Sequence, residues 1–337
     1  MSSVRKAVIT AAGMGTRQYP ASTTVQKEMF PLVDRDGLTK PTIQIIAEEA
    51  LESGIEEIAI IVSPGDEAAY RQHFSAISED LLPSFEGKDW ALLQSQRIAY
   101  LQEIITFIPQ PSPEGYGHAV WCAKDWVGDE PFLLLLGDHV YVSHTDKRCA
   151  RQLIDVYEQF HRSTFALKET HESMLHLFGT VAGQPLGRRH PVYRITDIKE
   201  KPDIRFAREQ LRIPGLDDAM YLCFFGMYVL TPQTFECIQY HIDNNIRERG
   251  EIQLTNALDM LRVHEGVYGA ETLGERYDMG IPFGYVETQI ALAMYGVNRT
   301  EILQSLRRII RESSGIDVIN MIEAALGHGF AADGEFT

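Results

Sequence analysis

The segment from residue 11 to residue 32 holds the residue types that a polyanion-binding loop needs. It reads AAGMGTRQYPASTTVQKEMFPL and includes Gly13, Gly15, Arg17 and Lys27. Glycines let backbone N–H groups approach an oxyanion closely, and the two cations place positive charge beside them. A strand, a glycine-rich loop and a helix in succession are typical of phosphate binding. The segment therefore predicts a loop for a triphosphate, with a glycine turn flanked by surface charges as the alternative.

Two common phosphate-binding loops do not fit this segment. A Walker loop requires GxxxxGK followed by Ser or Thr, and the GK at residues 87 and 88 is followed by Asp89 instead. A dinucleotide-binding loop requires GxGxxG leading into a helix, but here the third glycine is missing and Pro20 interrupts the helix. What is left is a wider loop with two movable cations.

Bulk composition excludes several classes of protein. The chain has 337 residues, of which 45% are apolar and 23% are charged, and this is the composition of an ordinary globular protein. Its formal net charge of −16 favours binding neither to a nucleic acid nor to an anionic membrane. Apolar runs stay well short of the roughly 20 residues that cross a bilayer, and a signal-peptide pattern is absent. The four scattered cysteines indicate free thiols, so we expect a cytoplasmic protein.

Short apolar runs alternate with helical patterns, which is typical of parallel strands joined by crossover helices. We predict an α/β, Rossmann-like fold with a mixed, mostly parallel central sheet covered by helices on both faces. The predicted strands cover residues 6–10, 56–62, 103–108, 131–138, 164–169, 192–202 and 221–230. The predicted helices cover residues 41–53, 66–74, 80–94, 232–242 and 254–263.

Residues 299–337 form a separate C-terminal helical extension in this interpretation, and residues 1–298 form one domain. Ile302, Leu306 and Ile310 recur at helical spacing, and a second helical pattern follows Gly315. The sequence therefore predicts a C-terminal helical hairpin. Its apolar face either packs on its own chain or contacts another subunit.

Further sequence blocks extend the likeness of the first loop to a known family. Together with the opening segment they resemble the sugar-1-phosphate nucleotidylyltransferases, in particular the bacterial UTP–glucose-1-phosphate uridylyltransferases, from residue 5 to residue 296. The blocks are SGIEEIAIIV (53–62), QPSPEGYGHAVWCA (110–123), LLLGD (134–138), FGTV (178–181), KEKP (199–202), GEIQLTNALDML (250–261) and YDMGIPFGY (277–285). The resemblance marks residues 1–298 as a nucleotidyltransferase domain.

The reaction that the resemblance implies is attack of a sugar-1-phosphate oxygen on the α-phosphorus of UTP, with release of pyrophosphate. The second pKa of a phosphate monoester is about 6, so the nucleophile is already an anion and needs no general base. Cations must instead shield the polyanions, and the implied catalytic residues are Arg17, Lys27 and Lys201. Asp138 ends a buried strand at the edge where open α/β sheets bind ligands, and its carboxylate suits Mg²⁺. Asp278 matches the position of the family's second magnesium aspartate.

The resemblance also implies residues that bind the nucleotide and the sugar. Gln110 can pair with the imide edge of uracil, and Gly115 lets the ring lie against the backbone. His118 is interpreted as a helix-start or core residue rather than a catalyst. The implied nucleotide-binding residues are Ala11, Ala12, Gly13, Gly15, Thr16, Gln110 and Gly115. The implied sugar-binding residues are Gly179, Glu200 and Glu251.

Several positions depart from the family pattern. Gln26 stands where proline is usual, residues 35–39 are an insertion, and Asn256 stands where aspartate is common. Met279 replaces a usual cysteine, and residues 281–282 replace a polar pair. These changes leave the phosphate and metal positions intact but bear on the choice of sugar. Glucose 1-phosphate is the expected sugar, and galactose, uronic acid and amino sugar phosphates are alternatives.

Two other classes of protein compete with the uridylyltransferase hypothesis. The first is a noncatalytic or regulatory relative that binds sugar nucleotides on the same fold. The second is a dehydrogenase, which would change nicotinamide absorbance. The family resemblance further implies a homo-oligomer, either a dimer or a tetramer.

Overall fold

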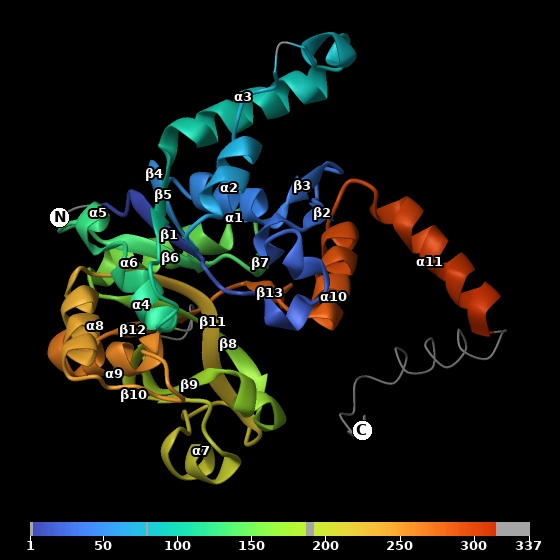
Figure 1. Ribbon diagram of the computed structural model, residues 1–337. Helices are drawn as coiled ribbons and strands as arrows, with labels where there is room; N and C mark the ends of the chain where they lie inside the picture. The colour runs from blue at the N-terminus through green and yellow to red at the C-terminus, as the bar shows by residue number, and fades with distance from the viewer. Residues whose placement is uncertain (1–2, 79, 187–191, 315–337) are drawn as a thin grey trace.

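The computed structural model describes residues 3–78, 80–186 and 192–314, and strands make up its centre (Figure 1). Strands of the first half are β1 (Lys6–Ala11), β2 (Pro31–Val33), β3 (Thr39–Pro41), β4 (Glu57–Val62), β5 (Ile105–Pro109), β6 (Phe132–Leu136) and β7 (His139–Ser143). Strands of the second half are β8 (Thr164–His171), β9 (Gly179–Pro185), β10 (Val192–Glu200), β11 (Met220–Leu230), β12 (Tyr268–Glu271) and β13 (Gly274–Asp278).

Helices surround these strands. They are α1 (Thr42–Leu51), α2 (Glu67–His73), α3 (Asp89–Ile104), α4 (Tyr116–Trp121), α5 (Lys124–Val127), α6 (Cys149–Phe160), α7 (Ile204–Gln210), α8 (Gln233–Asp243), α9 (Leu254–Glu265), α10 (Pro282–Met294) and α11 (Arg299–Ser314). No helix among the described residues is long and apolar enough to span a bilayer. All four cysteines are free thiols, as predicted.

The central sheet is mixed, and the prediction that it is mostly parallel is wrong. Nine strands lie in the order β5-β4-β1-β6-β11-β8-β12-β10-β9. Strands β5, β4, β1 and β6 are parallel neighbours. Beyond β6, antiparallel pairs dominate, and only the pair β8–β12 is parallel within the described sheet. A buried apolar run such as β11 reports burial on both faces but not strand direction, so the sequence pattern could not show this difference.

Helices cover both faces of the sheet, as predicted (Figure 1). Alternate residues of β1 show this arrangement. Ile9 packs in a buried cluster with residues of α1 and α6, whereas Val8 packs in a second cluster with residues of α8 and α9. Because successive side chains of a strand point to opposite faces, β1 supplies both layers of the core. Each fully buried side chain of this size stabilises the fold by about 1.5–3 kcal/mol.

Helix α3 shows where the sequence pattern misplaced an element. The prediction set a helix over residues 80–94 and a strand from residue 103, but α3 runs from Asp89 to Ile104 and leads directly into β5. Figure 1 shows that α3 projects from the body of the molecule. Trp90 and Leu93 on this helix are 51% and 64% exposed. Because α3 does not lie flat on the core, it lacks the apolar periodicity by which its ends could be recognised.

Helix α11 matches the first half of the predicted C-terminal hairpin and diverges from the body after α10 (Figure 1). The second helix of that prediction lies outside the described residues. Short strands were also missed, because a run of three to five residues with polar interruptions gives little periodicity. These are β2, β3, β7, β12 and β13, together with the longer β9.

Candidate active site

The glycine loop begins where β1 ends, in the middle of the parallel half of the sheet. Strand β1 lies between β4 and β6, so the loop emerges at the carboxyl edge of three parallel strands. Gly15 has φ 61° and starts a short 3-10 turn, Thr16–Gln18. This left-handed backbone suits glycine, and a Cβ at the position would also lie 3.2 Å from Ser22 Cβ. The glycine therefore lets the chain turn sharply toward the ligand side of the sheet.

A cavity of about 480 Å³ opens at this edge of the sheet. It is built from six separate parts of the chain: the glycine loop, the segment of Lys27, residues 110–119 leading into α4, the end of β6 with the turn that follows it, the turn after β10 and the segment before α9. The predicted site residues that line it are Ala12, Gly13, Arg17, Lys27, Gln110, Gly115, Asp138, Lys201 and Glu251. Residues far apart in sequence are thus brought together around one cavity.

Six predicted residues do not line this cavity. Ala11, Gly15 and Thr16 lie in the same loop as residues that do line it. Gly179 and Glu200 face each other on β9 and β10, where a Cβ on Gly179 would lie 3.1 Å from Glu200 Oε2. Asp278 lies beside Asp138, as described below. The structure therefore places these six next to the cavity rather than in its wall.

Lys27 and Asp138 form the ion pair at the centre of the cavity. Lys27 Nζ donates to Asp138 Oδ2 at 2.5 Å, and both side chains are almost entirely buried. Burial favours the neutral amine, but the charge of Asp138 raises the pKa of Lys27 above its usual value. Burial also opposes ionisation of Asp138, but Lys27 and, in its charged form at acidic pH, His139 hold the pKa of this carboxyl at about 2. Both members of the pair are therefore charged at neutral pH.

Glu28, which the sequence analysis did not select, lies next to this pair. Its side chain is buried, its Oε1 lies 3.6 Å from Lys27 Nζ, and its Oε2 accepts a hydrogen bond from the Tyr70 hydroxyl at 3.4 Å. Burial raises the pKa of Glu28 to about 8, although the charge of Lys27 acts in the opposite direction. At neutral pH this carboxyl is mostly protonated, so it does not compete with Asp138 for the ammonium.

Asp138, His139 and Asp278 form a group that fits a divalent cation. One ligand atom of each lies within 4.8 Å of those of the other two. Two carboxylates are the ligands that a hard cation such as Mg²⁺ takes from a protein. Burial lowers the pKa of His139 to about 4, and its buried Nδ1 has no hydrogen-bond partner among the described residues. The neutral imidazole is therefore also free to face a cation.

Antiparallel pairing of two short strands creates this group. Strand β13 pairs with β7, and the register places Asp278 opposite His139. Gly280 then packs against both carboxylates, because a Cβ there would lie 2.6 Å from Asp138 Oδ2 and 3.0 Å from Asp278 Oδ1. Any side chain at residue 280 would displace these carboxylates, so this position requires glycine. His139 was not selected from the sequence, although it directly follows Asp138 in LLLGDH.

Lys201 reaches the cavity from an unusual backbone conformation. It follows the end of β10 with φ 41°, a left-handed value that a residue with a Cβ seldom adopts. Its backbone N–H donates to the Phe178 carbonyl at 3.2 Å, and its ammonium lies 3.7 Å from Glu200 Oε1. Because the chain leaves the regular strand at this point, adjacent residues Glu200 and Lys201 lie near the same site.

Gln110 and Gly115 occupy one end of the cavity. The Gln110 side chain is buried, and its amide donates to the Gly115 carbonyl at 3.2 Å. A Cβ on Gly115, which has φ 115°, would lie 2.8 Å from Glu251 Cβ, so the glycine permits this close approach. His118 is buried in α4, and its Nδ1 lies 3.2 Å from Gln110 Nε2. This position agrees with the interpretation of His118 as a helix-start or core residue.

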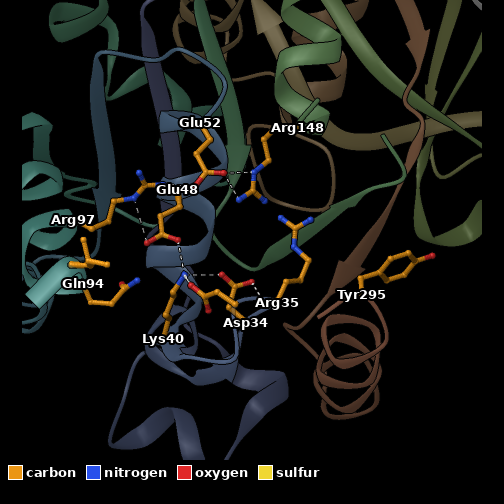
Figure 2. Close-up of a pocket in the computed structure, with 11 residues that line it drawn as sticks. Asp34, Arg35, Lys40, Glu48, Glu52, Gln94, Arg97, Arg148 and Tyr295 are labelled. Atoms are coloured by element: carbon orange, nitrogen blue, oxygen red, sulfur yellow. Dashed lines mark hydrogen bonds and ion pairs between the residues drawn. The ribbon is translucent and has the colours of Figure 1, made fainter. Parts of the chain in front are cut away.

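A second charged cavity, of about 520 Å³, lies between the β2–β3 hairpin, α1, α3 and the start of α6 (Figure 2). At its floor Lys40 is buried and contacts three carboxylates. Its Nζ lies 2.8 Å from Asp34 Oδ2, 2.7 Å from Asp36 Oδ2 and 2.8 Å from Glu48 Oε2. Asp36 belongs to the insertion that was noted in the sequence.

Two arginines of this second cavity are also paired. Arg97 contacts Glu48 at 3.8 Å and forms an ion pair with Glu52, and Arg148 Nε donates to Glu52 Oε2 at 2.7 Å (Figure 2). Arg35 lines the cavity as well, but its guanidinium has no hydrogen bond or ion pair to another described residue. Most cations here are thus matched by carboxylates of the same chain.

Comparison with known proteins identifies the family of this chain. A sequence model of the nucleotidyl transferase family matches residues 6–289. The UTP–glucose-1-phosphate uridylyltransferase of Bacillus subtilis (strain 168) is 38% identical over 296 residues, which is 87% of this chain and 92% of that protein. The enzyme of the same name from Staphylococcus epidermidis (strain RP62A) is 35% identical over 313 residues, covering 93% of this chain and 99% of that protein.

Solved structures show the same similarity in three dimensions. The UTP-bound UDP-glucose pyrophosphorylase from Acinetobacter baumannii aligns with a TM-score of 0.73 and 25% identity, covering 90% of this chain and 98% of that chain. A UDP-glucose pyrophosphorylase in complex with UDP-glucose aligns with a TM-score of 0.68 and 28% identity, covering 86% and 98%. The fold is therefore the mixed α/β nucleotidyltransferase fold, and this chain belongs to the nucleotidyl transferase family.

Proposed function

We propose that this protein transfers a uridylyl group from UTP to glucose 1-phosphate, giving UDP-glucose and pyrophosphate. The observation that carries this proposal is the convergence of Arg17, Lys27, Asp138 and Lys201 on one cavity at the carboxyl edge of the parallel strands. Relatives and solved structures named for this reaction or its nucleotides cover most of the chain. A protein that only binds sugar nucleotides would not need this combination of cations and carboxylates.

The cations of the cavity supply the main chemical contribution of the chain. Arg17 is exposed beside the glycine loop and has no hydrogen bond or ion pair to another described residue, so it is free to meet the triphosphate. Lys27 is charged and nearly buried, so its field acts in a medium of low dielectric constant. Lys201 faces the same space and would hold the sugar phosphate. Together they would lower the repulsion between the two anions and stabilise the departing pyrophosphate.

Mg²⁺ is the proposed cofactor, and Asp138 and Asp278 are the residues that would hold it. When bound, it would neutralise charge on the phosphate oxygens. Gly280 leaves room for both carboxylates, and the ion pair with Lys27 keeps Asp138 ionised across the neutral pH range. The neutral His139 adds no positive charge that would oppose a cation here.

Base and sugar selection are assigned to the two ends of the cavity. Gln110 would pair with uracil, and its hydrogen bond to the Gly115 carbonyl orients the amide before the base enters. Ala12, Gly13, Gly15 and Thr16 would hold the triphosphate with the backbone of the loop after Ala11. Glu200, which faces Gly179, and Glu251, which lies beside Gly115, would accept hydrogen bonds from sugar hydroxyls. Glu200 Oε2 is already oriented, because it accepts a hydrogen bond from Thr255 Oγ1 at 2.7 Å.

The direct test incubates the protein with Mg²⁺, one nucleoside triphosphate and one sugar 1-phosphate, and measures pyrophosphate release. The panel contains UTP, dTTP, CTP, ATP and GTP, each with glucose, galactose, glucuronic acid and N-acetylglucosamine 1-phosphates. We expect release with UTP and glucose 1-phosphate above every other pair. Faster release with a different pair would replace the assigned substrate, and binding of UDP-glucose without any release would indicate a noncatalytic relative.

We also infer that residues 299–337 form an extension of the domain 1–298, and that α10 and α11 contact a second copy of the chain. Phe283, Val286 and Ile290 lie at helical spacing on α10 and are 74%, 55% and 46% exposed. Ile290 also lines an apolar groove of about 370 Å³ between α10, α11 and the β2–β3 hairpin. Helix α11 carries four arginines and two glutamates, so it would suit the acidic surface of a chain with net charge −16.

Light scattering tests the contact surface. A Val286→Asp, Ile290→Asp double variant should have a lower molar mass in solution than the wild type, because buried charges disfavour an apolar interface. Val263→Asp is the control, since Val263 is 70% exposed on the distant α9. A wild-type protein that is monomeric, or a double variant with unchanged mass, would contradict this assignment.

A further inference from the structure

A buried hydrogen bond joins the glycine loop to the turn that follows Asp278. The side-chain amide of Gln18 donates to the backbone carbonyl of Met279 at 2.7 Å, although the two residues are 261 positions apart. The Gln18 side chain is 8% exposed and Met279 is fully buried. Breaking this hydrogen bond would leave a buried donor and a buried acceptor without partners, which costs more free energy than breaking a hydrogen bond at the surface. The contact therefore holds the two segments in a fixed relative position.

The peptide groups around Met279 are held from both sides. The Met279 N–H donates to the Asp138 carbonyl at 3.0 Å, while its carbonyl accepts from Gln18. The next residue, Gly280, donates its N–H to Asp278 Oδ1 at 2.9 Å. In the turn 278–280, Met279 is thus bonded to the backbone of Asp138, and Gly280 is bonded to the carboxylate of Asp278. Gln18 is the residue that attaches this turn to the phosphate-binding loop.

Little space is available for the turn to move. Gly280 lies so close to Asp138 and Asp278 that even a Cβ would come within 3.0 Å of a carboxylate oxygen of each. A displacement of the turn by a fraction of an ångström would therefore change the separation of these oxygens. Metal ligands are sensitive to such changes, because loss of a group that orients a ligand typically lowers metal affinity by about 10–100-fold.

The direction of Gln18 also affects its neighbour. Gln18 ends the short turn Thr16–Gln18, and its N–H donates to the Gly15 carbonyl at 2.9 Å. Arg17 is exposed on the ligand side of this turn, whereas Gln18 points inward. With Gln18 anchored, the backbone from which Arg17 projects has a defined direction. Gln18 itself does not line the cavity, so it acts on a ligand only through other residues.

We propose that Gln18 is a positioning residue for the cation site of this enzyme. Its amide holds the turn 278–280 in place, and thereby sets the distance between the carboxylates of Asp138 and Asp278 and the direction of Arg17. This inference rests on the proposed function, because that function supplies the reason for a cation between the two aspartates. It adds a residue from the glycine loop to a site whose ligands come from the β6–β7 turn, β7 and β13.

Two variants of Gln18 test the proposal. Gln18→Met keeps the length and burial of the side chain but removes the donor, and Gln18→Asn keeps the donor but shortens the arm. The first measurement is the affinity of the nucleotide-free protein for Mn²⁺, which serves as a paramagnetic probe of a Mg²⁺ site and is followed by electron paramagnetic resonance. We expect both variants to bind Mn²⁺ about ten-fold more weakly than the wild type.

Steady-state kinetics give the second measurement. In both variants kcat should fall by about ten-fold and the Mg²⁺ concentration for half-maximal rate should rise, whereas the KM for glucose 1-phosphate should stay within about two-fold. Gln44→Met is the matched control, because Gln44 is also a buried glutamine and bonds Glu48 and His73 away from the cavity. It should lower the melting temperature but leave Mn²⁺ affinity unchanged.

The outcomes separate this proposal from the proposed function. If folded Gln18 variants bind Mn²⁺ as tightly as the wild type, the positioning role is wrong even where the wild type makes UDP-glucose. If the wild type makes no UDP-glucose but the variants bind Mn²⁺ more weakly, the cation site stands and the function fails. Circular dichroism confirms folding, and if one variant fails to fold, the other provides the measurement.

Discussion

The cavity at the glycine loop, which is the proposed active-site cavity, and the cavity behind the β2–β3 hairpin both contain several cations, but they differ in how these cations are matched. In the active-site cavity, Arg17 has no ion pair to a described residue and Lys201 has only a distant one with Glu200. In the second cavity, Lys40 alone contacts three carboxylates (Figure 2). A matched cation holds the fold together, whereas an unmatched one retains the capacity to bind an anion.

The two cavities are linked by a short piece of chain. Lys27 and Lys40 stand at either end of a segment that includes β2, the insertion 35–39 and β3. Similar lysines, thirteen positions apart, are therefore expected to serve different purposes. Substitutions at matched positions in the two cavities can separate stability from turnover, and the predictions below begin with the largest expected effect.

Lys40→Met should produce the largest change, in stability. It leaves Asp34 and Glu48 buried without their shared cation, and a broken buried pair costs about 3–5 kcal/mol in the free energy of unfolding. Urea unfolding followed by circular dichroism measures this loss. The kcat of the folded variant at low temperature should remain close to that of the wild type. A large fall in kcat would mean that the two cavities are not separate in function.

Lys27→Ala should have its largest effect on turnover, and it also leaves the buried Asp138 without its paired cation. It removes a charge from the centre of the active-site cavity, and loss of one such group raises the reaction barrier by about 3–4 kcal/mol. Pyrophosphate release should therefore fall by about 10²–10³-fold, and Lys201→Ala and Asp138→Ala should behave similarly. The melting temperature, compared with that of Lys40→Met, checks that the fold is retained. Near wild-type rates in all three variants would show that the site is misplaced.

Glu49→Gln should change the pH dependence of stability. Burial raises the pKa of Glu49 to about 7 from its ordinary value of 4.5. The folded protein then holds a proton that the unfolded chain has lost, so the free energy of unfolding falls as pH rises from about 4.5 to about 7. Glutamine cannot ionise and removes this part of the slope, on the order of 2 kcal/mol.

Urea midpoints at pH 5 and pH 8 provide the measurement for Glu49. The wild type should lose more stability between these two values than the variant does. Glu28, whose pKa is about 8, titrates in the same direction in both proteins and cancels in the comparison. Equal slopes would mean that Glu49 is ionised in the folded state through its contact with Arg148.

Arg35→Ala should have the smallest effect. This guanidinium has no ion pair among the described residues, so its removal should change the free energy of unfolding by less than about 1 kcal/mol. Arg148→Ala is the matched comparison, since it leaves Glu49 without a paired arginine and Glu52 with Arg97 alone, and it should cost more. An equal or larger loss for Arg35→Ala would show that the second cavity depends on all four of its cations.

Much of the site could be predicted because it lies at the ends of strongly patterned elements. Strand β6 is apolar throughout and strand β1 has an apolar centre, so the glycine loop and Asp138 could be placed at the same edge of the sheet. Asp278 could be included only through the family resemblance. Its position depends on the pairing of β13 with β7, and two five-residue strands with polar side chains give no periodic signal.

Other features depended on tertiary contacts that no local pattern contains. Gln18 looks like any polar loop residue in the sequence, and its role is visible only because Met279 lies across from it in the fold. Glu28 likewise looks like a surface charge, but it is buried under the loop with Tyr70. Strand direction beyond β6 was missed for the same reason. The direction of a strand depends on its pairing with distant segments, whereas an apolar run indicates only that the strand is buried.

The backbone of Lys201 sets stability against activity at one position. Holding a residue with a Cβ at φ 41° costs on the order of 1 kcal/mol that glycine would not incur. Lys201→Gly should therefore have a larger free energy of unfolding than Lys201→Ala, and both variants would lack the ammonium group. The residue that best suits this corner of the chain has nothing to offer a phosphate, so the protein tolerates local strain in order to keep a charge there.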